Sequence, residues 1–585
     1  MTNDMVMPAR AKEMPDRVKG FRWWAEAKDR FFERLAPHID GFGKAMAFPD
    51  KGMLGNVKVF DTTARDGMQT PEVPAFVTEQ RGRSVVQNKV EICMRLAQWG
   101  IPIIEVGNAV SNDGEVEAIK TVKRMVEEQD LGTEIVSLGR MVRRDVDAAK
   151  LAEADTMHVY SSGSVPHAWV KLGKMPEELI PDIVDCVRYA REQGFANIIV
   201  SLEDAARTDP DHLVEVGKRI FDAAGGKGIQ YNIPDTVGVC SPAYMYALIS
   251  HIRSEIPELP LQVHCHNDMG MAAQNSIAAM LAGVSVVQTT MHGVGERTGN
   301  AALEEVAMYM YANHGIEIVD MAQLADVSAF ISERFGVGPA MNKPIVGKRA
   351  FRHTAGVHVD GLVKSEKSGF SDRDSGRDGG SVYAAFNPRT IGREEDVWIS
   401  ALSGKKSITH KLGEFGISVP DDNVDAILSK VKDMAATKAV SDADFLLMAY
   451  DAAFGKPCRR ADVISIDVST GTSGRSARVL VKVGDDEREG EDTEGNGTVD
   501  VAVRAIRSAI GNGTGIEISS YECHGIGSGS DAAARVTMTI RKKGLEVESS
   551  TVGTDTTMVS IEAFTKGYDA VCALEELRSA YPAAK

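Results

Sequence analysis

The sequence predicts an α/β protein: a TIM (β/α)8 barrel, followed by a helical linker region and a C-terminal α+β domain with an internal duplication. Three observations lead to this fold class. Eight β-branched runs alternate with helix-like stretches, polar residues follow these runs, and two similar segments stand near the C-terminus. The expected boundaries are 1–50 for an N-terminal extension, 51–325 for the barrel, 326–460 for the helical linker subdomains and 461–585 for the C-terminal domain.

The eight strand-like runs alternate with longer stretches that have the apolar spacing of helices. The runs lie at 57–61, 101–107, 133–139, 155–160, 196–204, 228–235, 259–268 and 284–295. Their starts are roughly 20 to 45 residues apart, which is the room that a strand, a crossover helix and loops need. The runs are continuously apolar because helices would cover both faces of a parallel sheet. Eight such units predict a closed barrel rather than an open sheet.

The chain beyond the predicted barrel is first helical and then strand-rich. The helical part is interrupted by the Gly/Ser/Asp-rich segment 365–381, which we expect to be a mobile loop. In the strand-rich part, a strand at 476–483 and a helix at 499–510 are echoed by a strand at 533–540 and a helix at 559–571. Two strand-strand-helix copies predict a pseudo-twofold module. Because the module contains no obvious catalytic group, we expect it to serve binding or regulation.

Composition and charge narrow the classes of partner. A formal net charge of -17 without a Lys/Arg cluster disfavours nucleic acid, because phosphate neutralisation needs clustered cations. The seven cysteines form no CxxC pair and no closely spaced framework, which indicates reduced thiols and a cytoplasmic protein. No apolar run reaches the roughly 18 residues of a membrane span. The spacing in residues 20–40 predicts a helix that packs on its own chain or on a partner subunit.

Polar residues gather after the predicted strands, and in a barrel this position is the C-terminal face, where active sites are built. They are Arg65, Asp66, Glu105, His158, Glu203, Asp235, His264, His266 and Asn300. His264 and His266 are two apart on a strand, so both imidazoles point to one face. Two structural histidines would give the same pattern, but Asp66 on the same rim favours a metal site. This set suits a divalent metal such as Mg, Mn, Zn or Co.

Arg65, next to Asp66 in the chain, indicates what such a metal site could do. Its guanidinium would stabilise the alkoxide that forms when a metal-polarised carbonyl group is attacked. A surface arginine is the alternative interpretation. The reaction would also need a base, and Glu203 and His358 are the available candidates. Each of these two residues, taken alone, is more often structural than catalytic.

These motifs together resemble the DRE-TIM metallolyase family. The resemblance rests on 63-TARDG-67 with Gln69, on Glu105, and on the motifs 201-SLEDAARTD-209, 232-NIPDTVG-238, 264-HCHNDMG-270, 293-GVGERTGNAALEEV-306 and 521-YECHGIGSGSDAAARVTM-538. Within the family, the chain is most similar to 2-isopropylmalate synthase and its relatives, citramalate synthase and homocitrate synthase. The resemblance runs from about residue 56 to the C-terminus, and the duplicated unit resembles the regulatory dimer domain of such enzymes.

The resemblance implies a role for each matching residue. The divalent metal would be held by Asp66, His264, His266 and Asn300. The catalytic residues would include Arg65, which would contact the keto oxygen. Glu203 and His358 would together abstract the proton, and Tyr383 would assist them. The substrate-binding residues would be Gln69, Glu105, His158, Ser201, Asn232 and Thr236. Of these, Thr236 would bind the substrate carboxylate, and Glu105 would hold Arg65 in place.

The resemblance also implies a reaction, the metal-dependent Claisen condensation of acetyl-CoA with a 2-oxo acid, which releases CoA. Small or polar groups at Ser201 and Asn232 leave room for the branched chain of 2-oxoisovalerate, which would give 2-isopropylmalate in branched-chain amino acid biosynthesis. Citramalate or homocitrate synthase on the same scaffold is the alternative. A dicarboxylate substrate would need a further cation, which Arg140 or Arg143 could supply.

Two interpretations from other classes stay open at this point. A carbon-carbon lyase of the hydroxymethylglutaryl-CoA type would use the same metal barrel, although it would not need a duplicated C-terminal module. A non-catalytic effector-binding protein would not need the metal ligands or Glu203. For the synthase, the implied partners are acetyl-CoA, an amino-acid effector at the C-terminal domain and a second copy of the chain, in a homodimer or higher oligomer.

Overall fold

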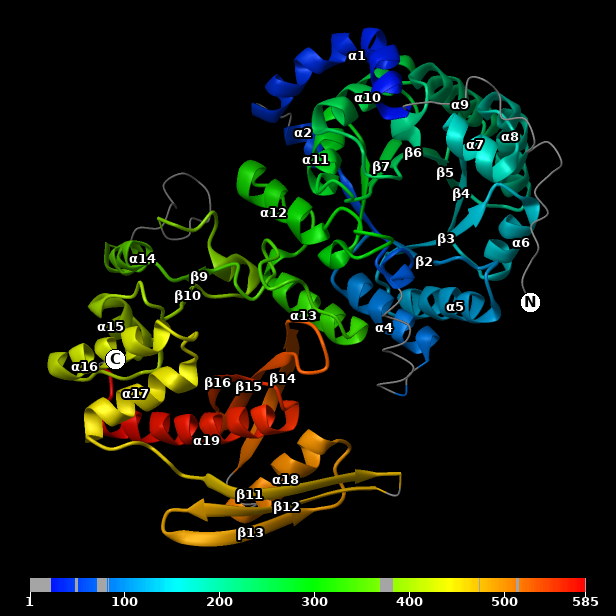
Figure 1. Ribbon diagram of the computed structural model, residues 1–585. Coiled ribbons are helices and arrows are strands. Elements are labelled where there is room, and N and C mark those ends of the chain that lie inside the picture. Colours follow the sequence, from blue (N-terminus) through cyan, green and yellow to red (C-terminus); the bar gives the residue numbers. More distant parts are fainter. Residues whose placement is uncertain are drawn as a thin grey trace. The chain divides into compact units, whose positions relative to one another are not determined.

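The computed structural model describes residues 23–47, 51–70, 82, 84–368, 382–472, 474–511 and 515–583, which form two compact units (Figure 1). The first unit holds the described residues up to Ala350 together with 385–394. The second unit holds 351–368, 382–384 and the described residues from Glu395 onward.

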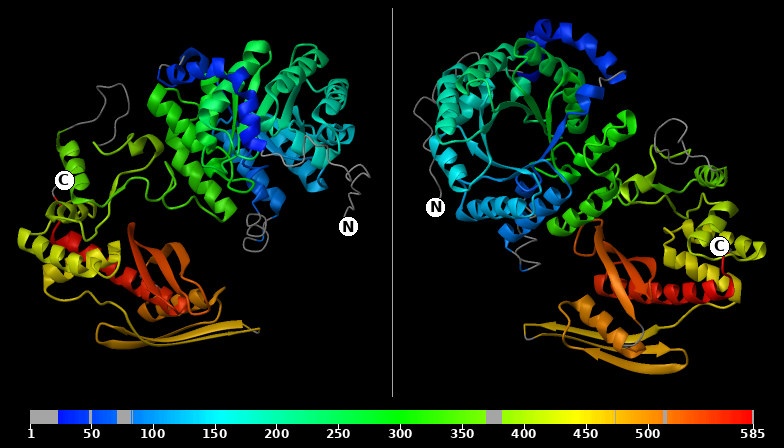
Figure 2. Two further views of the ribbon diagram at one scale, coloured as in Figure 1. Left: turned by 45° about the horizontal axis from the view of Figure 1, so that its top comes forward. Right: turned by 180° about the vertical axis from the view of Figure 1, so that it is seen from behind.

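The first unit is built on a closed barrel of eight parallel strands, which forms the ring in Figures 1 and 2. The strands are β1 (Lys58–Asp61), β2 (Ile103–Gly107), β3 (Glu134–Arg140), β4 (Thr156–Ser162), β5 (Asn197–Glu203), β6 (Ile229–Asp235), β7 (Leu261–Cys265) and β8 (Val286–Thr289). Each strand pairs with its neighbours in sequence order, and β1 closes the ring on β8 with Phe60 opposite Gln288. The predicted barrel is therefore confirmed.

Helices cover the outside of the barrel, and most of them connect successive strands. They are α4 (Val85–Gln98), α5 (Asp113–Glu128), α6 (Arg143–Leu151), α7 (Val165–Leu172), α8 (Pro176–Glu192), α9 (Pro210–Ala223), α10 (Pro242–Glu255), α11 (Ala272–Ala282), α12 (Leu303–His314) and α13 (Leu324–Phe335). Their starts follow the sequence: Ser84 begins α4 with a reciprocal capping box, and the Asn112 side chain caps α5.

The hydrophobic core of the barrel lies on both sides of the strands. Inside the ring, Phe60, Ile103, Val136, Ile199 and Val286 form one buried cluster that draws a residue from each of five strands. A larger cluster packs the helices onto the outer faces of the strands. Burial on both faces explains why the strands have apolar sequences without alternation. Because the strands are parallel, their carboxyl ends and the loops that follow them lie at one face of the barrel.

The N-terminal helix α1 (Trp23–Ala47) packs against α10 on the outside of the barrel, and the short helix α2 (Lys51–Leu54) leads from there towards β1. Phe31 and Leu35 of α1 are buried in the outer hydrophobic cluster. Arg34 forms an ion pair with Asp209, which caps the start of α9. The helix therefore packs on its own chain, which is one of the two arrangements that the sequence predicted.

The second unit begins with helices, as the sequence predicts. They are α14 (Gly356–Ser368), α15 (Lys405–Glu414), α16 (Asp421–Ala435) and α17 (Asp442–Phe454), and the short strands β9 (Arg352–His353) and β10 (Asp396–Val397) pair in parallel beside them. The buried ammonium group of Lys411 joins three of these elements through ion pairs to Asp396, Glu414 and Asp442. The predicted mobile loop 365–381 begins inside α14, and its remainder from residue 369 lies outside the described residues.

The C-terminal part of the second unit is duplicated. β11 (Asp462–Gly471), β12 (Gly474–Val483) and β13 (Asp486–Asp492) form one antiparallel sheet followed by α18 (Thr498–Ile510), while β14 (Ile516–Ile526), β15 (Ala533–Lys542) and β16 (Leu545–Gly553) form another followed by α19 (Thr556–Ala580). Each copy thus has three strands, one more than predicted. β11 and β14 open the two copies and are largely exposed.

No helix in the described part of the chain combines the length and the apolar composition that a membrane span requires.

Candidate active site

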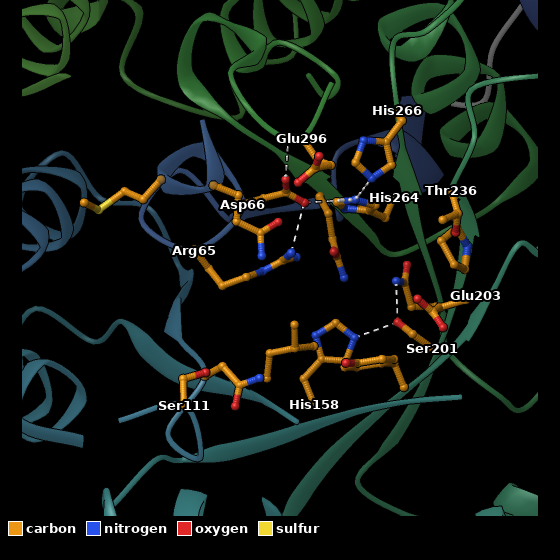
Figure 3. Close-up of a pocket in the computed structure, with 18 of the residues that line it drawn as sticks. Arg65, Asp66, Ser111, His158, Ser201, Glu203, Thr236, His264, His266 and Glu296 are labelled. Atoms are coloured by element: carbon orange, nitrogen blue, oxygen red, sulfur yellow. Dashed lines mark hydrogen bonds and ion pairs between the residues drawn. The ribbon is translucent and has the colours of Figure 1, made fainter. Parts of the chain in front are cut away.

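A cavity of about 470 Å³ opens at the carboxyl ends of the barrel strands (Figure 3). Ten of the residues predicted from the sequence line it: Arg65, Asp66, Gln69, His158, Ser201, Glu203, Asn232, Thr236, His264 and His266. Asp66 and the two histidines lie together on one side, and His158 and Ser201 face them from the other. The barrel topology therefore brings together side chains from five strands that are far apart in the sequence, β1, β4, β5, β6 and β7.

Asp66, His264 and His266 form a compact group of metal-ligating atoms. Asp66 stands in the loop after β1, His264 lies on β7, and His266 follows the end of that strand. The two Nε2 atoms are 3.2 Å apart, and Nε2 of His264 is 3.6 Å from Oδ2 of Asp66. All three side chains are buried, and one ligand atom of each lies within 4.8 Å of the others. The two imidazoles and the carboxylate thus converge on one point.

The charge states of this group suit a divalent cation. Burial, followed by repulsion from His266, lowers the pKa of His264 to about 3, and burial also lowers the pKa of His266. Both imidazoles are therefore neutral near pH 7, as metal ligation requires. Burial alone would raise the pKa of Asp66, but Arg65 and the two histidines outweigh it and hold the pKa at about 2. An ionised carboxylate and two neutral imidazoles are a donor set for Mg, Mn, Zn or Co.

Asn300 lies next to this group. Its backbone pairs with that of His266 in an isolated bridge, and its Nδ2 donates to the carbonyl oxygen of Val294 at 3.1 Å. The Oδ1 atom is buried and has no hydrogen-bond partner among the described residues. An unpaired buried amide oxygen costs free energy, so a cation bound next to His266 would satisfy it. The predicted fourth ligand therefore fits the site.

Gly295 makes the close packing of the metal group possible, and we expect Gly295→Ala to damage it. A Cβ atom at this position would lie 2.2 Å from Nδ2 of Asn300 and 2.9 Å from Oδ1 of Asp66. The alanine variant should bind metal at least about ten-fold more weakly, since displaced partners of metal ligands typically cost that much. Metal titration would measure the loss. Gly43→Ala is the control, because its Cβ would meet nothing within 4 Å; equal metal affinity in both variants would contradict the prediction.

Arg65 is held by a chain of buried polar groups. Its Nε donates to Oε2 of Glu105 at 2.5 Å, and its Nη1 donates to Oδ2 of Asp66 at 3.0 Å. The other oxygen of Glu105 contacts Nδ1 of His158 at 2.6 Å, and Nε2 of His158 contacts the hydroxyl group of Ser201 at 2.6 Å. The chain ends at Asn232, whose Nδ2 donates to that hydroxyl group at 2.7 Å. The network fixes the guanidinium beside the metal group.

Glu105 is the charged centre of this network. Burial would raise its pKa, but Arg65 and His158 outweigh burial and hold the pKa well below its usual range. Its side chain is fully buried and also accepts a hydrogen bond from the Thr62 hydroxyl group at 3.0 Å. Glu105 lies behind Arg65 and His158 and does not itself line the cavity. Its position suits the role of holding Arg65 rather than direct contact with a substrate.

Glu203 and Thr236 occupy another part of the rim. Oε2 of Glu203 accepts from Nζ of Lys171, on α7, at 2.5 Å. The Thr236 hydroxyl oxygen accepts from the backbone N–H of Asp204 at 2.9 Å, which leaves its own proton free to be donated to a ligand in the cavity. A proton acceptor and a hydroxyl donor therefore stand at neighbouring positions of the cavity wall.

Besides Glu105 and Asn300, further residues singled out from the sequence are not among those that line the cavity. His358 and Tyr383 belong to the second unit, where their rings stack with centroids 4.2 Å apart. Arg140 and Arg143 pair with Asp145 and Asp185, and neither is among the described residues that line the cavity. The expectation that one of these arginines could supply a cation for a dicarboxylate substrate is therefore not supported: Arg140, at the end of β3, binds the buried carboxylate of Asp145, and Arg143 forms an exposed pair with Asp185.

The cavity also holds groups that the sequence reasoning missed. Lys89 of α4 is buried and pairs with Glu115 at 2.6 Å, and Gln288 of β8 presents a buried amide. Arg297 lines the rim and binds the carboxylate of Asp268 and the backbone carbonyl of Thr236. Arg297 lies inside a motif that the sequence singled out. Lys89 gives no such signal, since a lysine on an amphipathic helix is ordinarily at the surface.

Family models match successive parts of the chain. Residues 56–331 match the HMGL-like model, residues 374–439 match the homocitrate synthase post-HMGL domain-like model, and residues 439–572 match the LeuA allosteric (dimerisation) domain. The first match spans the barrel strands. The last match includes both copies of the duplicated unit.

Known relatives extend this similarity over most of the chain. A probable 2-isopropylmalate synthase of Methanopyrus kandleri is 35% identical over 88% of this chain and 98% of its own length. A putative (R)-citramalate synthase CimA of the same organism is 34% identical over 88% and 97%. Among solved structures, a hydroxymethylglutaryl-CoA lyase from Pseudomonas aeruginosa has a TM-score of 0.41 at 22% identity, over 50% of this chain and 95% of that one. By the identity and coverage of its relatives, the chain belongs to the family of the 2-isopropylmalate and (R)-citramalate synthases.

Proposed function

We propose that this chain catalyses the metal-dependent condensation of acetyl-CoA with a 2-oxo acid, with 2-oxoisovalerate as the first candidate substrate and 2-isopropylmalate as its product. The observation that carries the proposal is the convergence of Asp66, His264 and His266 beside the buried guanidinium of Arg65. This arrangement can bind a carbonyl oxygen and receive the negative charge that develops on it. The membership of the family supports the same class of reaction.

The keto acid binds between the metal group and Thr236. A divalent cation held by Asp66, His264, His266 and Asn300 would supply Lewis-acid polarisation of the keto group. Thr236 donates its hydroxyl proton to the substrate carboxylate, because its oxygen already accepts from the chain. Arg65 donates to the keto oxygen. Its guanidinium, fixed by Glu105, needs no rearrangement when that oxygen becomes an alkoxide, and such preorganisation is a large part of catalysis.

Glu203 is the base of the proposed reaction, and His358 and Tyr383 of the second unit are its proposed partners. The carboxylate takes a proton from the methyl group of acetyl-CoA, and the C–H electrons form the enolate. The enolate carbon attacks the keto carbon, and the π electrons of the keto group move to the oxygen beside Arg65. This alkoxide oxygen then takes a proton from water. Water attacks the thioester carbonyl, the C–S bond breaks, and CoA leaves as the thiol.

The side chain of the keto acid faces the remaining wall of the cavity. His158, Ser201, Asn232, Leu138 and Pro234 line it. The small side chain of Ser201 leaves room for the branched chain of 2-oxoisovalerate. The second candidate substrate is pyruvate, because the citramalate synthase relative is nearly as similar as the 2-isopropylmalate synthase relative. One methylene group changes binding by only about 1–3 kcal/mol, so an assay is needed to choose between them.

The duplicated C-terminal domain supports two further parts of the proposal. It matches the LeuA allosteric (dimerisation) domain, and we infer that it pairs two copies of the chain and binds an amino-acid effector. Control would then arise from different affinities of the effector for two arrangements of the chain.

Release of free CoA by the purified chain tests the proposed function. The enzyme is mixed with acetyl-CoA and Mg or Mn, and 2-oxoisovalerate, pyruvate, 2-oxobutyrate and 2-oxoglutarate are offered in turn. We expect metal-dependent release that requires a 2-oxo acid and is fastest with 2-oxoisovalerate. Fastest release with pyruvate would move the assignment to the citramalate reaction. CoA release that does not depend on a 2-oxo acid, or the absence of any CoA release, would contradict the proposal.

A further inference from the structure

The proposed base carries an ion pair at the rim of the cavity. Nζ of Lys171 lies 2.5 Å from Oε2 of Glu203. The carboxylate is the more buried partner, since its side chain is 22% exposed and that of Lys171 is 43% exposed. Oε1 of Glu203 has no hydrogen-bond partner among the described residues, and Glu203 lines the cavity. One oxygen of the base is therefore occupied, and the other is available to a ligand.

The helix that carries Lys171 is fixed to the strand end that carries Glu203. Ser164 caps α7, and its hydroxyl group donates to Oδ2 of Asp204, the residue after Glu203, at 2.5 Å. Asp204 adopts a left-handed conformation with φ +64, which is uncommon for a residue other than glycine. Arg207 binds the same carboxylate at 2.8 Å. Lys171 thus extends from an element that is anchored next to the residue it contacts.

Other ionisable groups near Glu203 make no such contact. Tyr160 of β4 and His167 of α7 both lie within electrostatic range of its carboxylate. Within the described part of the chain, neither of them forms a hydrogen bond or an ion pair with it. Lys171 is accordingly the group that can set the orientation of this carboxylate.

We propose that Lys171 is a positioning residue for Glu203: its ammonium group holds Oε2 and so directs Oε1 at the methyl group of acetyl-CoA. This inference rests on the proposed function, in which Glu203 is the base. A carboxylate with free rotation would spend less time in the geometry that proton transfer needs, and a misplacement of about 1 Å can cost about 100-fold in rate. Lys171 should therefore act on the rate of proton abstraction and leave the binding of the 2-oxo acid unchanged.

Lys171→Met tests the proposal, because methionine keeps an unbranched stem and removes the charge. We expect kcat to fall about ten-fold, with KM for the 2-oxo acid unchanged within about two-fold. Lys171→Arg should restore most of the rate, since it can still donate to Oε2. Lys174→Met is a matched control: Lys174 is 44% exposed and pairs with Asp182 at the same 2.5 Å, and its variant should keep the wild-type kcat.

A kinetic isotope effect separates positioning from a general structural defect. With a trideuterated acetyl group, Lys171→Met should show a larger isotope effect on kcat than the wild type, because proton abstraction has become slower than the later steps. A variant that merely contained less folded enzyme would lose rate at an unchanged isotope effect. An unchanged isotope effect, or a loss of rate in Lys174→Met equal to that in Lys171→Met, would overturn the proposal.

A double-variant comparison shows whether Lys171 acts through Glu203. In the Glu203→Gln background, Lys171→Met should reduce the residual rate by less than about two-fold, because the carboxylate it positions is gone. A ten-fold loss in that background would overturn the inference alone. A wild-type enzyme without CoA release that depends on a 2-oxo acid would overturn the proposed function, and the inference with it. The two failures are distinguishable because the second is seen in the wild type.

Discussion

Replacing His266 by alanine should reduce metal affinity and the rate of CoA release together. The Nε2 atom of His266 is one of the ligand atoms that converge on the proposed cation, and its loss leaves a vacant position at the edge where Asn300 lies. Changes in residues that only support metal ligands cost about 10- to 100-fold in metal affinity, so the loss of a ligand should exceed about 100-fold. Titration of the metal-depleted protein and the CoA-release assay would measure the two effects.

The control for this prediction is a histidine of the duplicated domain. His524 is 67% exposed and lies on β14, so His524→Ala should keep the metal affinity of the wild type. If His266→Ala also kept it, or lost activity without any change in metal affinity, the assignment of the metal group would be wrong.

Replacing Glu105 by glutamine should have the largest effect on stability. The substitution removes the buried charge that both Arg65 and His158 contact, and it leaves the guanidinium with one of its two carboxylate partners. Removing one member of a buried ion pair typically costs about 3–5 kcal/mol, because the remaining charge stays desolvated. We expect a loss at the lower end of this range, since Arg65 keeps Asp66. Urea unfolding would measure it, and kcat should fall as well because Arg65 is no longer fixed.

A surface carboxylate serves as the control for Glu105. Glu255 pairs with Lys218 at 3.3 Å, and both side chains are about half exposed. Glu255→Gln should barely change the unfolding midpoint, because exposed ion pairs contribute little. A Glu105→Gln protein as stable as the Glu255→Gln protein would contradict the role of Glu105 as the centre of the network.

The fold was largely predictable because its signals are strong and repeated. The strand runs are apolar and β-branched, and the intervening stretches begin with caps such as Ser84 and Asn112. One strand of each duplicated copy was not predicted, since each copy has three strands where two were expected. The opening strands β11 and β14 are exposed over most of their length. Their place in the sheets comes from backbone pairing with β12 and β15.

The candidate site was predictable where topology alone decides position. Asp66 and His264 are far apart in the chain, and they meet because the strands of a barrel all end at one face. Contacts made by helix side chains could not be predicted in this way. Lys171 and Lys89 look like ordinary surface lysines until the helices are placed on the strands. The opposite case is that of Arg140 and Arg143 near the end of β3, which suggested a cation at the pocket but bind Asp145 and Asp185 and do not line it.

The formation of a carbon-carbon bond is the central claim, and labelled acetyl-CoA tests it most directly. The proposed reaction is run with doubly ¹³C-labelled acetyl-CoA, 2-oxoisovalerate and Mg or Mn, and the acids formed are analysed by mass spectrometry. The account predicts a 2-isopropylmalate that carries both labelled carbons, formed only with metal and lost in His266→Ala. Labelled acetate and free CoA without any labelled 2-hydroxy dicarboxylic acid would contradict it, because the protein would then hydrolyse the thioester without joining the two substrates.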